Sequence, residues 1–324
     1  MDGSKRILVT GANGFIGKAL CGRLVSDGWL VNGAVRSGKA AQIAAGVTAV
    51  EIDGVHTDTD WEKALRAVDT VVHLAARVHV MKNDTDDPLI AYRKINVDGT
   101  ENLARQAAAA GVRRFVFLST VKVNGEESWG PFAETDTPAP VDSYGISKME
   151  AERKLHQIAA ETKMAVVILR APLVYGPGVK ANFLKLLQTV DRGTPLPFAG
   201  VKNQRSLIYI ENLVDAIAAC IRHPNASGQT YLVSDGDDVS TPELIRMLSA
   251  SLHKPSRLFT VPGLCLYIAG RLAGKGPTMD RLIGSLTVDT SKIRAELGWT
   301  PSFTLAKGIE ETVAWFRGCD ASSR

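Results

Sequence analysis

Tyr144 and Lys148 are the residues whose types and spacing most directly indicate chemistry, because they lie four apart in the segment Tyr-Gly-Ile-Ser-Lys. At that spacing two side chains share one face of a helix. An ammonium beside a phenol favours the phenolate and lowers a pKa that is ordinarily about 10, which predicts an acid–base role. Thr120 precedes Tyr144 by 24 residues, and its hydroxyl could orient the same substrate oxygen. We predict Thr120, Tyr144 and Lys148 as the catalytic residues.

A glycine-rich segment, Thr-Gly-Ala-Asn-Gly-Phe-Ile-Gly at residues 10–17, lies between an apolar run at 7–10 and a helical pattern that closes at Gly28. Glycines at this spacing permit a tight turn and bring backbone N–H groups close to a pyrophosphate at a helix N-terminus. A plain turn is the alternative, but the strand–loop–helix context favours dinucleotide binding. The predicted cofactor-binding residues of this loop are Gly11, Asn13, Gly14, Phe15, Ile16 and Gly17.

The end of the second expected strand bears on which dinucleotide binds. Residues 33–39 contain no carboxylate, although an NAD site usually has one here for the adenosine ribose. Arg36 instead stands where a guanidinium could pair with a 2′-phosphate, unless it is an ordinary solvated arginine. The sequence thus predicts NADP(H), with NAD(H) as the alternative. Asp53, after the third strand, is either an acceptor for the adenine amino group or a surface turn residue.

Strand and helix patterns alternate up to about residue 170, which predicts an α/β fold with a parallel sheet and helices on both faces. Beyond that point prolines and glycines interrupt the pattern. We expect a dinucleotide-binding domain at 1–170, which 206–236 rejoin, and a smaller, mostly helical substrate domain at 171–324. The expected strands are 7–10, 30–35, 47–52, 70–74, 114–118, 166–169, 206–210 and 230–233, and the expected helices include 60–67, 89–110 and 212–222.

The composition is that of an ordinary soluble globular protein, with 324 residues, 45% of them hydrophobic and 22% charged. A net charge of +4 is too weak to indicate nucleic-acid binding. No apolar stretch approaches the roughly 20 residues needed to span a bilayer, and the first residues lead directly into a strand. The four cysteines have neither CxxC pairing nor metal-ligand spacing. We expect a cytoplasmic protein with no metal and no nucleic-acid or membrane partner.

Taken together, these motifs resemble the extended short-chain dehydrogenase/reductase family, and within it the nucleotide-sugar epimerases, reductases and dehydratases. The resemblance covers essentially the whole chain. Besides the glycine loop and the Thr/Tyr/Lys triad, it includes His-Leu-Ala-Ala at 73–76, Asn-Val-Asp-Gly-Thr at 96–100, Tyr-Gly-Pro-Gly at 175–178, Asp-Thr-Ser-Lys at 289–292 and Leu-Gly-Trp at 297–299. It implies a doubly wound Rossmann domain and a C-terminal domain that closes on a nucleoside-diphosphate sugar.

The resemblance also implies roles for individual residues. Tyr144 would exchange a proton with the sugar, Thr120 would bind the reacting oxygen, and Lys148 would also hold the nicotinamide ribose. It implies a homodimer through the alanine-rich helix near 103–110 and the helix that bears Tyr144, with packing inside one chain as the alternative. The remaining implied residues are Leu74, Ala75 and Ala76 for the cofactor, and Arg205, Asn182 and Arg281 for the UDP-sugar.

Lys122 could reach the substrate pocket, or it could equally be a solvent-facing residue between two valines. His73 is expected to pack beneath the cofactor. His73 and His79 lie six apart, and a metal site would need more ligands than these two.

Departures from the family pattern limit the reactions that the chain is expected to catalyse. Val121 and Lys122 follow Thr120 where the 4,6-dehydratases carry carboxylates, and Leu173 replaces an asparagine that many epimerases have. The chain looks most like bacterial surface-polysaccharide (O-antigen) enzymes. We predict 4-keto reduction of a UDP-4-keto-6-deoxy-N-acetylhexosamine, with 4-epimerisation of UDP-glucose or UDP-N-acetylglucosamine as the alternative. A non-enzymatic redox sensor is disfavoured because Tyr144 and Lys148 are both present.

Overall fold

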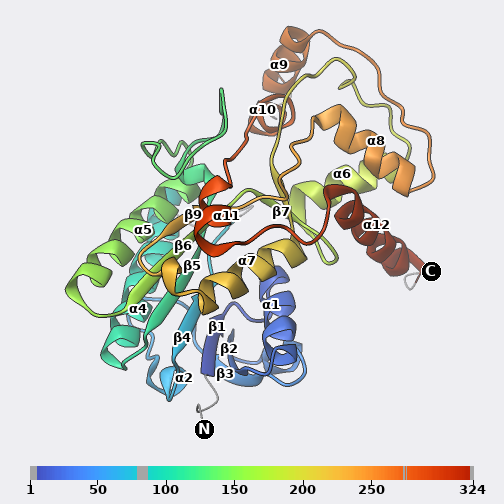
Figure 1. The fold of residues 1–324 in the computed structure, drawn as a ribbon. Coiled ribbons are helices and arrows are strands. Elements are labelled where there is room, and N and C mark those ends of the chain that lie inside the picture. The colour runs from blue at the N-terminus through green and yellow to red at the C-terminus, as the bar shows by residue number, and fades with distance from the viewer. Residues whose placement is uncertain (1–5, 79–86, 273, 275, 322–324) are drawn as a thin grey trace.

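A seven-stranded parallel sheet, in the order β3-β2-β1-β4-β5-β6-β9, forms the centre of the molecule (Figure 1). The computed structural model describes residues 6–78, 87–272, 274 and 276–321. The fold class that the sequence predicts is confirmed, and most strands lie within a residue or two of their expected bounds. The strands are β1 (Arg6–Thr10), β2 (Leu30–Arg36), β3 (Thr48–Ile52), β4 (Thr70–His73), β5 (Arg114–Thr120), β6 (Ala165–Ala171) and β9 (Thr230–Leu232).

Helices cover both faces of this sheet. Successive side chains of a strand point to opposite faces, so strands that are apolar throughout have apolar side chains to bury on both. In β1, Ile7 and Val9 join one apolar cluster, whereas Leu8 joins the other. The first cluster is covered by α1 (Phe15–Ser26) and α7 (Ile210–Arg222), and the second by α4 (Gly99–Ala109) and α5 (Ser143–Glu161). The sheet is therefore buried on both sides, which explains why its strands read as continuous apolar runs.

The register of the strands gathers their carboxyl ends at one edge. Thr10 pairs with His73, His73 pairs with Phe117, and Thr120 pairs with Ala171. The strand order reverses between β1 and β4, and open α/β sheets bind ligands at the carboxyl ends beside such a switch point. The glycine loop and Thr120 follow strands that end there.

The expected helix at 89–110 is interrupted. It consists of α3 (Pro88–Arg93), a π-helical turn (Lys94–Asp98) and α4. π-turns inside helices occur frequently at functional sites, and this one contains the buried Asn96. The expected helix at 60–67 is shorter, with α2 limited to Glu62–Leu65.

The predicted return of the chain to the main sheet is correct for one strand and wrong for the other. β9 pairs with β6, but β8 (Leu207–Tyr209) pairs with β7 (Leu173–Tyr175) in a separate two-stranded sheet. A three-residue apolar strand carries no local signal of its partner, so the sequence could not distinguish these outcomes.

Beyond β7 the chain is largely helical; α7 and β9 return to the main sheet, and most of the other helices extend away from it (Figure 1). None of the helices in the described part of the chain is long and apolar enough to cross a membrane. Besides α7, the helices beyond β7 are α6 (Ala181–Asp191), α8 (Thr241–Ser251), α9 (Gly263–Leu272), α10 (Gly276–Ile283), α11 (Ser291–Leu297) and α12 (Leu305–Ala321).

Candidate active site

The glycine loop packs against the sheet edge so closely that side chains could not fit. Gly11 has φ +67°, and a Cβ there would lie 3.1 Å from the backbone nitrogen of Ala75. A Cβ on Gly17 would lie 2.1 Å from the Gly11 carbonyl oxygen. Gly14 is the N-cap of α1, so the N-terminus of that helix lies directly after the loop. A glycine cradle at a helix N-terminus suits the pyrophosphate of a dinucleotide.

A buried hydrogen-bond chain holds the segment after β4 beside this loop. Thr10 Oγ1 accepts hydrogen bonds from the N–H groups of Leu74 and Ala75, each at 3.1 Å. Its own hydroxyl faces Nδ1 of His73 at 2.7 Å, and Nε2 of His73 faces Thr100 Oγ1 at 3.0 Å. Burial lowers the pKa of His73 to about 3, so the ring is neutral and takes a structural role. The predicted residues 74–76 thus lie next to Gly11.

The surroundings of Arg36 differ from what the sequence indicates. Arg36 is exposed at the end of β2, as expected, but β3 brings two carboxylates to the loop that follows. Glu51 Oε1 accepts from the Gly38 N–H at 3.1 Å, and Asp53 Oδ1 accepts from the Ser37 hydroxyl at 3.5 Å. Sequence reasoning missed Glu51, because no local pattern tells which residues of a neighbouring strand approach a loop. Positive and negative charges therefore meet where a ribose 2′ group would be recognised.

A cavity of about 680 Å³ contains Thr120 and Tyr144 together with all the predicted substrate residues. Thr120 lies at the end of β5, and Tyr144 lies in the first turn of α5. Arg205 donates a hydrogen bond to the Gly284 carbonyl at 3.0 Å, and burial lowers the pKa of its guanidinium. The predicted substrate residues that line the cavity are Lys122, Asn182, Arg205 and Arg281.

Lys148 lies behind this cavity rather than in it. Among the described residues it is not part of the cavity lining, and it is only 2% exposed. Its ammonium donates to the Leu118 carbonyl at 2.6 Å and lies 3.7 Å from the centre of the Phe117 ring. Burial lowers the pKa of Lys148 to about 7. The residue is therefore close to titrating at neutral pH.

The pKa of Tyr144 moves in the direction opposite to that predicted from the Tyr-x-x-x-Lys spacing. Burial raises it, and the carboxylate of Asp142 adds to the effect, followed by Tyr92. Lys148 is not among the groups that shift the Tyr144 pKa, and its ammonium donates to the Leu118 carbonyl. The Asp142 carboxylate is held close to Tyr144 because Asp142 is the N-cap of α5 and accepts a hydrogen bond from the Gly145 N–H at 2.7 Å.

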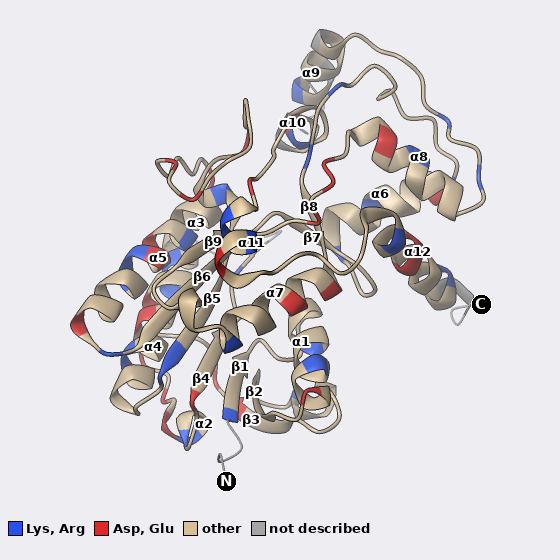
Figure 2. Ribbon diagram, in the orientation of Figure 1, with Lys and Arg blue, Asp and Glu red and all other residues tan. Residues whose placement is uncertain are grey.

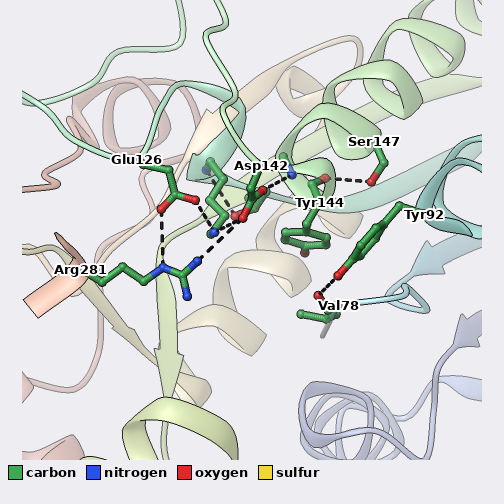
Figure 3. Close-up of polar contacts among 10 residues, drawn as sticks. Val78, Tyr92, Glu126, Asp142, Tyr144, Ser147 and Arg281 are labelled. Carbon is green, nitrogen blue, oxygen red and sulfur yellow. Dashed lines mark hydrogen bonds and ion pairs between the residues drawn. The ribbon is translucent and has the colours of Figure 1, made fainter. Parts of the chain in front are cut away.

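Two cations and two carboxylates meet beside the cavity, and Figure 3 labels three of them, Glu126, Asp142 and Arg281. The Lys122 ammonium contacts both Glu126 and Asp142, with 2.5 Å to Asp142 Oδ2. Arg281 approaches the same two carboxylates, at 3.8 Å from Glu126 and 3.9 Å from Asp142. Burial alone would raise the pKa of Asp142, but hydrogen bonds from Lys122 and from the Gly145 N–H lower it. Lys122 thus lines the cavity, with its ammonium paired to two carboxylates.

Sequence reasoning missed several residues that surround Tyr144. The Tyr92 hydroxyl donates to the Val78 carbonyl at 2.9 Å, and its ring centre lies 6.3 Å from that of Tyr144 (Figure 3). Asn96 donates to Ser147 at 3.0 Å, and Ser147 donates to the Tyr144 carbonyl at 2.8 Å. Two of these residues had a signal in the sequence: Asn96 is part of the Asn-Val-Asp-Gly-Thr motif, and Asp142 directly precedes a helix, where aspartate often serves as the N-cap. Glu126 and Tyr92 carry no such signal.

A parallel sheet with a glycine cradle at its switch point, next to a cavity with a Tyr/Lys helix, defines an oxidoreductase of the short-chain dehydrogenase/reductase class. The model of the NAD dependent epimerase/dehydratase family matches residues 7–234. The chain belongs to this family and is an enzyme of the nucleotide-sugar oxidoreductase type. The predicted family and enzyme class are confirmed.

Individual relatives support this assignment along nearly the whole chain. A Vibrio cholerae protein named UDP-glucose 4-epimerase is 46% identical over 316 residues, which cover 96% of this chain and 95% of that one. An Escherichia coli O157:H7 protein, named N-acetyl-alpha-D-glucosaminyl-diphospho-ditrans,octacis-undecaprenol 4-epimerase, is 26% identical and covers 95% and 94%. The structure of MoeE5 in complex with UDP-glucuronic acid and NAD superimposes with a TM-score of 0.79 at 26% identity, over 97% of this chain and 99% of that one.

Proposed function

We propose that this enzyme is a UDP-hexose 4-epimerase. The main observation in support is that one cavity combines the hydroxyl of Thr120 and the phenol of Tyr144 with two cations. These cations are Arg205 and Arg281. Cations suit a diphosphate, and the hydroxyl groups suit the sugar oxygen that reacts. The 46% identity to a protein named UDP-glucose 4-epimerase supports the same activity.

In this proposal Tyr144 moves the proton at the sugar O4. It removes the O4 proton as C4 loses a hydride, and it returns the proton when the hydride is delivered to the other face of the 4-keto sugar. Thr120 donates to or accepts from O4 and fixes its position. The raised pKa keeps the phenol of Tyr144 protonated and makes it a weak acid, so proton transfer in either direction needs a nearby cation that stabilises the phenolate. In this proposal the cation is Lys148, one helical turn away on α5.

The residues present fit a nicotinamide dinucleotide, which when bound takes up and returns the C4 hydride. The cradle of Gly11, Gly14 and Gly17 would hold its pyrophosphate, and the backbone of 74–76 would line it. Glu51 and Asp53 favour NAD(H), because carboxylates repel a 2′-phosphate and accept from ribose hydroxyls.

A second candidate is NADPH-dependent reduction of a UDP-4-keto-6-deoxy-N-acetylhexosamine. Arg36 favours it, since an exposed guanidinium at the end of β2 can pair with a 2′-phosphate. The two candidates share the C4 hydride and the proton on Tyr144, and they differ in whether the cofactor is retained or consumed.

The discriminating experiment uses the purified protein without added cofactor. With UDP-glucose or UDP-N-acetylglucosamine, NMR should show conversion to the 4-epimer, and a Tyr144→Phe preparation purified in parallel should show none beyond a trace. No interconversion, together with stoichiometric NADPH consumption on the UDP-4-keto sugar, would replace the epimerase with the reductase.

We further propose that residues 171–324, apart from the segment that returns to the main sheet, form the substrate-binding part of the enzyme. The enzyme would act as a homodimer through α4 and α5. Within one chain, ion pairs between Arg105 and Glu161 and between Lys154 and Glu101 already join α4 to α5, so the two helices would enter the interface as one unit. Light scattering at low salt should give the mass of two chains, and a monomer mass would contradict the dimer.

A further inference from the structure

α9 lies at the end of the molecule opposite the N-terminus (Figure 1). One of its faces packs onto the protein, because Leu266 is buried in the core. Gly270 lies so close to Met279 of α10 that a Cβ there would come within 2.7 Å of the methionine side chain. Among the α9 residues whose side chains the structure describes, Leu266 and Gly270 therefore mark the side that packs onto the protein.

The opposite face of α9 is apolar and exposed. Ile268 is 49% exposed and Leu272 is 85% exposed, and their i,i+4 spacing places them on the same side. Phe259, in the preceding loop, is also 48% exposed. A surface helix of a soluble domain normally presents polar side chains to water. Here both the inward and the outward sides are apolar.

The stretch of sequence that contains α9 carries charge of one sign, although Asp191 pairs with Lys254 and Asp280 of α10 lines the same cavity as Arg271. From Leu244 to Met279 the chain has no Asp or Glu and five Lys or Arg. This segment carries +5, whereas the whole chain carries +4. Figure 2 accordingly shows blue without red along α9 and along the loop that precedes it. In this segment Arg257 and Arg271 are exposed.

We propose that α9 and the preceding loop, residues 254–272, dock this enzyme on an anionic phospholipid surface. Exposed aliphatic side chains flanked by cations are the pattern of a helix that lies in the headgroup region of a bilayer. Each nearby cation adds attraction to anionic lipid. A second copy of this chain is a poor occupant, since the exposed cations Arg257 and Arg271 of two such faces would repel each other. Such docking is peripheral and needs no membrane-spanning segment.

The position of α9 links the docking face to the substrate cavity. Tyr267 and Arg271 line a second cavity of about 870 Å³, and the two cavities share Glu126 and Arg281 in their walls. Docking through the outer face of α9 would therefore hold the active site close to the lipid surface. The inference goes beyond the proposed C4 chemistry and does not depend on it.

The test measures co-sedimentation of the full-length protein with vesicles of phosphatidylglycerol and phosphatidylcholine, without substrate. The wild type should sediment with these vesicles and remain in solution with pure phosphatidylcholine. The double variant Ile268→Glu/Leu272→Glu should lower the partition coefficient by about tenfold or more. Arg257→Gln should lower it about fivefold on anionic vesicles. Leu30→Glu, which changes a 41% exposed leucine at the start of β2, is the matched control and should bind like the wild type.

Two outcomes would overturn the proposal. One is wild-type protein that stays in solution with anionic vesicles at low salt. The other is a double variant that still binds them like the wild type. If the wild type does not bind vesicles and the double variant loses oligomeric mass in light scattering, the face is a protein interface instead. Circular dichroism checks folding, and turnover of a soluble UDP-sugar by the same variants reports separately on the proposed function.

Discussion

Tyr144 and Lys148 have different surroundings although they are separated by a single helical turn. Tyr144 borders the cavity with the Asp142 carboxylate nearby, whereas Lys148 is enclosed beneath β5 and donates to the Leu118 carbonyl. Burial acts on both, raising the pKa of the phenol and lowering that of the ammonium. The sequence predicts that the two residues share a helix face, but it does not predict the burial and the electrostatic environment of each group.

Replacing Tyr144 with Phe tests its role as the proton-transfer group. We expect kcat to fall by about two to four orders of magnitude, while the affinity for the cofactor changes little, since the ring is kept and the hydroxyl is lost. Steady-state kinetics and a cofactor titration measure both quantities.

Tyr92→Phe is the matched control, because its hydroxyl donates to the Val78 carbonyl. The kcat of this variant should fall by less than about tenfold, since the substitution removes one neutral hydrogen bond. Near-normal turnover of Tyr144→Phe would remove Tyr144 from the mechanism.

Arg36→Ala tests the choice of cofactor. Losing a charge-assisted contact of about 1.5–3 kcal/mol should weaken NADP(H) by about ten- to 150-fold and leave NAD(H) nearly unchanged. Fluorescence titration with both reduced cofactors provides the measurement.

The converse variant is Asp53→Asn, which removes a carboxylate next to the same loop. It should improve the affinity for NADP(H), because a charge that repels the 2′-phosphate is lost. Equal effects of Arg36→Ala on the two cofactors would show that its guanidinium does not recognise the 2′-phosphate.

At the level of elements, α1 and α5 place the two halves of the site. α1 starts where the glycine loop ends, and α5 starts where Asp142 caps its first turn. Both starts lie at the carboxyl edge of the sheet, so the helix N-termini face the place where ligands bind in such folds. The π-turn at 94–98 adds a brace, because its Asn96 reaches Ser147 on α5.

Gly17→Ala tests how tightly α1 packs against the loop. Because the new Cβ would lie 2.1 Å from the Gly11 carbonyl oxygen, backbone must move, which should cost about 1–3 kcal/mol of stability and weaken cofactor binding. Urea denaturation and a cofactor titration measure the two effects.

Gly22→Ala is the control on the same helix, where an added Cβ meets nothing within 4 Å. It should raise stability by about 0.5–1 kcal/mol, because alanine loses less backbone entropy than glycine on helix formation. If both variants behave alike, close packing at Gly17 is not what requires a glycine.

For the whole molecule, stability at acid pH depends on a group buried at the centre of the sheet. His73 has its pKa lowered from 6.5 to about 3, so between these values the unfolded chain binds the proton and the folded protein does not. The free energy of unfolding therefore falls as pH decreases through this range, and near neutral pH this group contributes no pH dependence.

Urea denaturation at a series of pH values between 3 and 7 should show this slope in the wild type. In His73→Gln the free energy of unfolding should change less steeply with pH, by an amount that corresponds to up to about one proton bound on unfolding. His156→Gln, at an exposed position on α5, should keep the wild-type slope. An unchanged slope in His73→Gln would show that His73 is already protonated in the folded state.

The sequence by itself determined the features that depend on near neighbours in the chain. Apolar runs and helical periodicity indicated the main strands and helices, and the loop at 10–17 indicated the cofactor cradle. The spacing of Tyr144 and Lys148 placed both on one helix. The inferences about strands, helices and the shared helix succeed because backbone geometry makes residues at short spacings share a face or a turn.

Only the tertiary structure decided which distant residues meet. It paired β8 with β7, brought Glu51 and Asp53 to the loop after Arg36, and surrounded Lys122 with Glu126 and Asp142. It also reversed the expected pKa shift of Tyr144. The physical reason is that strand pairing, burial and electrostatic fields act over a few ångströms in space and depend on partners tens of residues away in the chain.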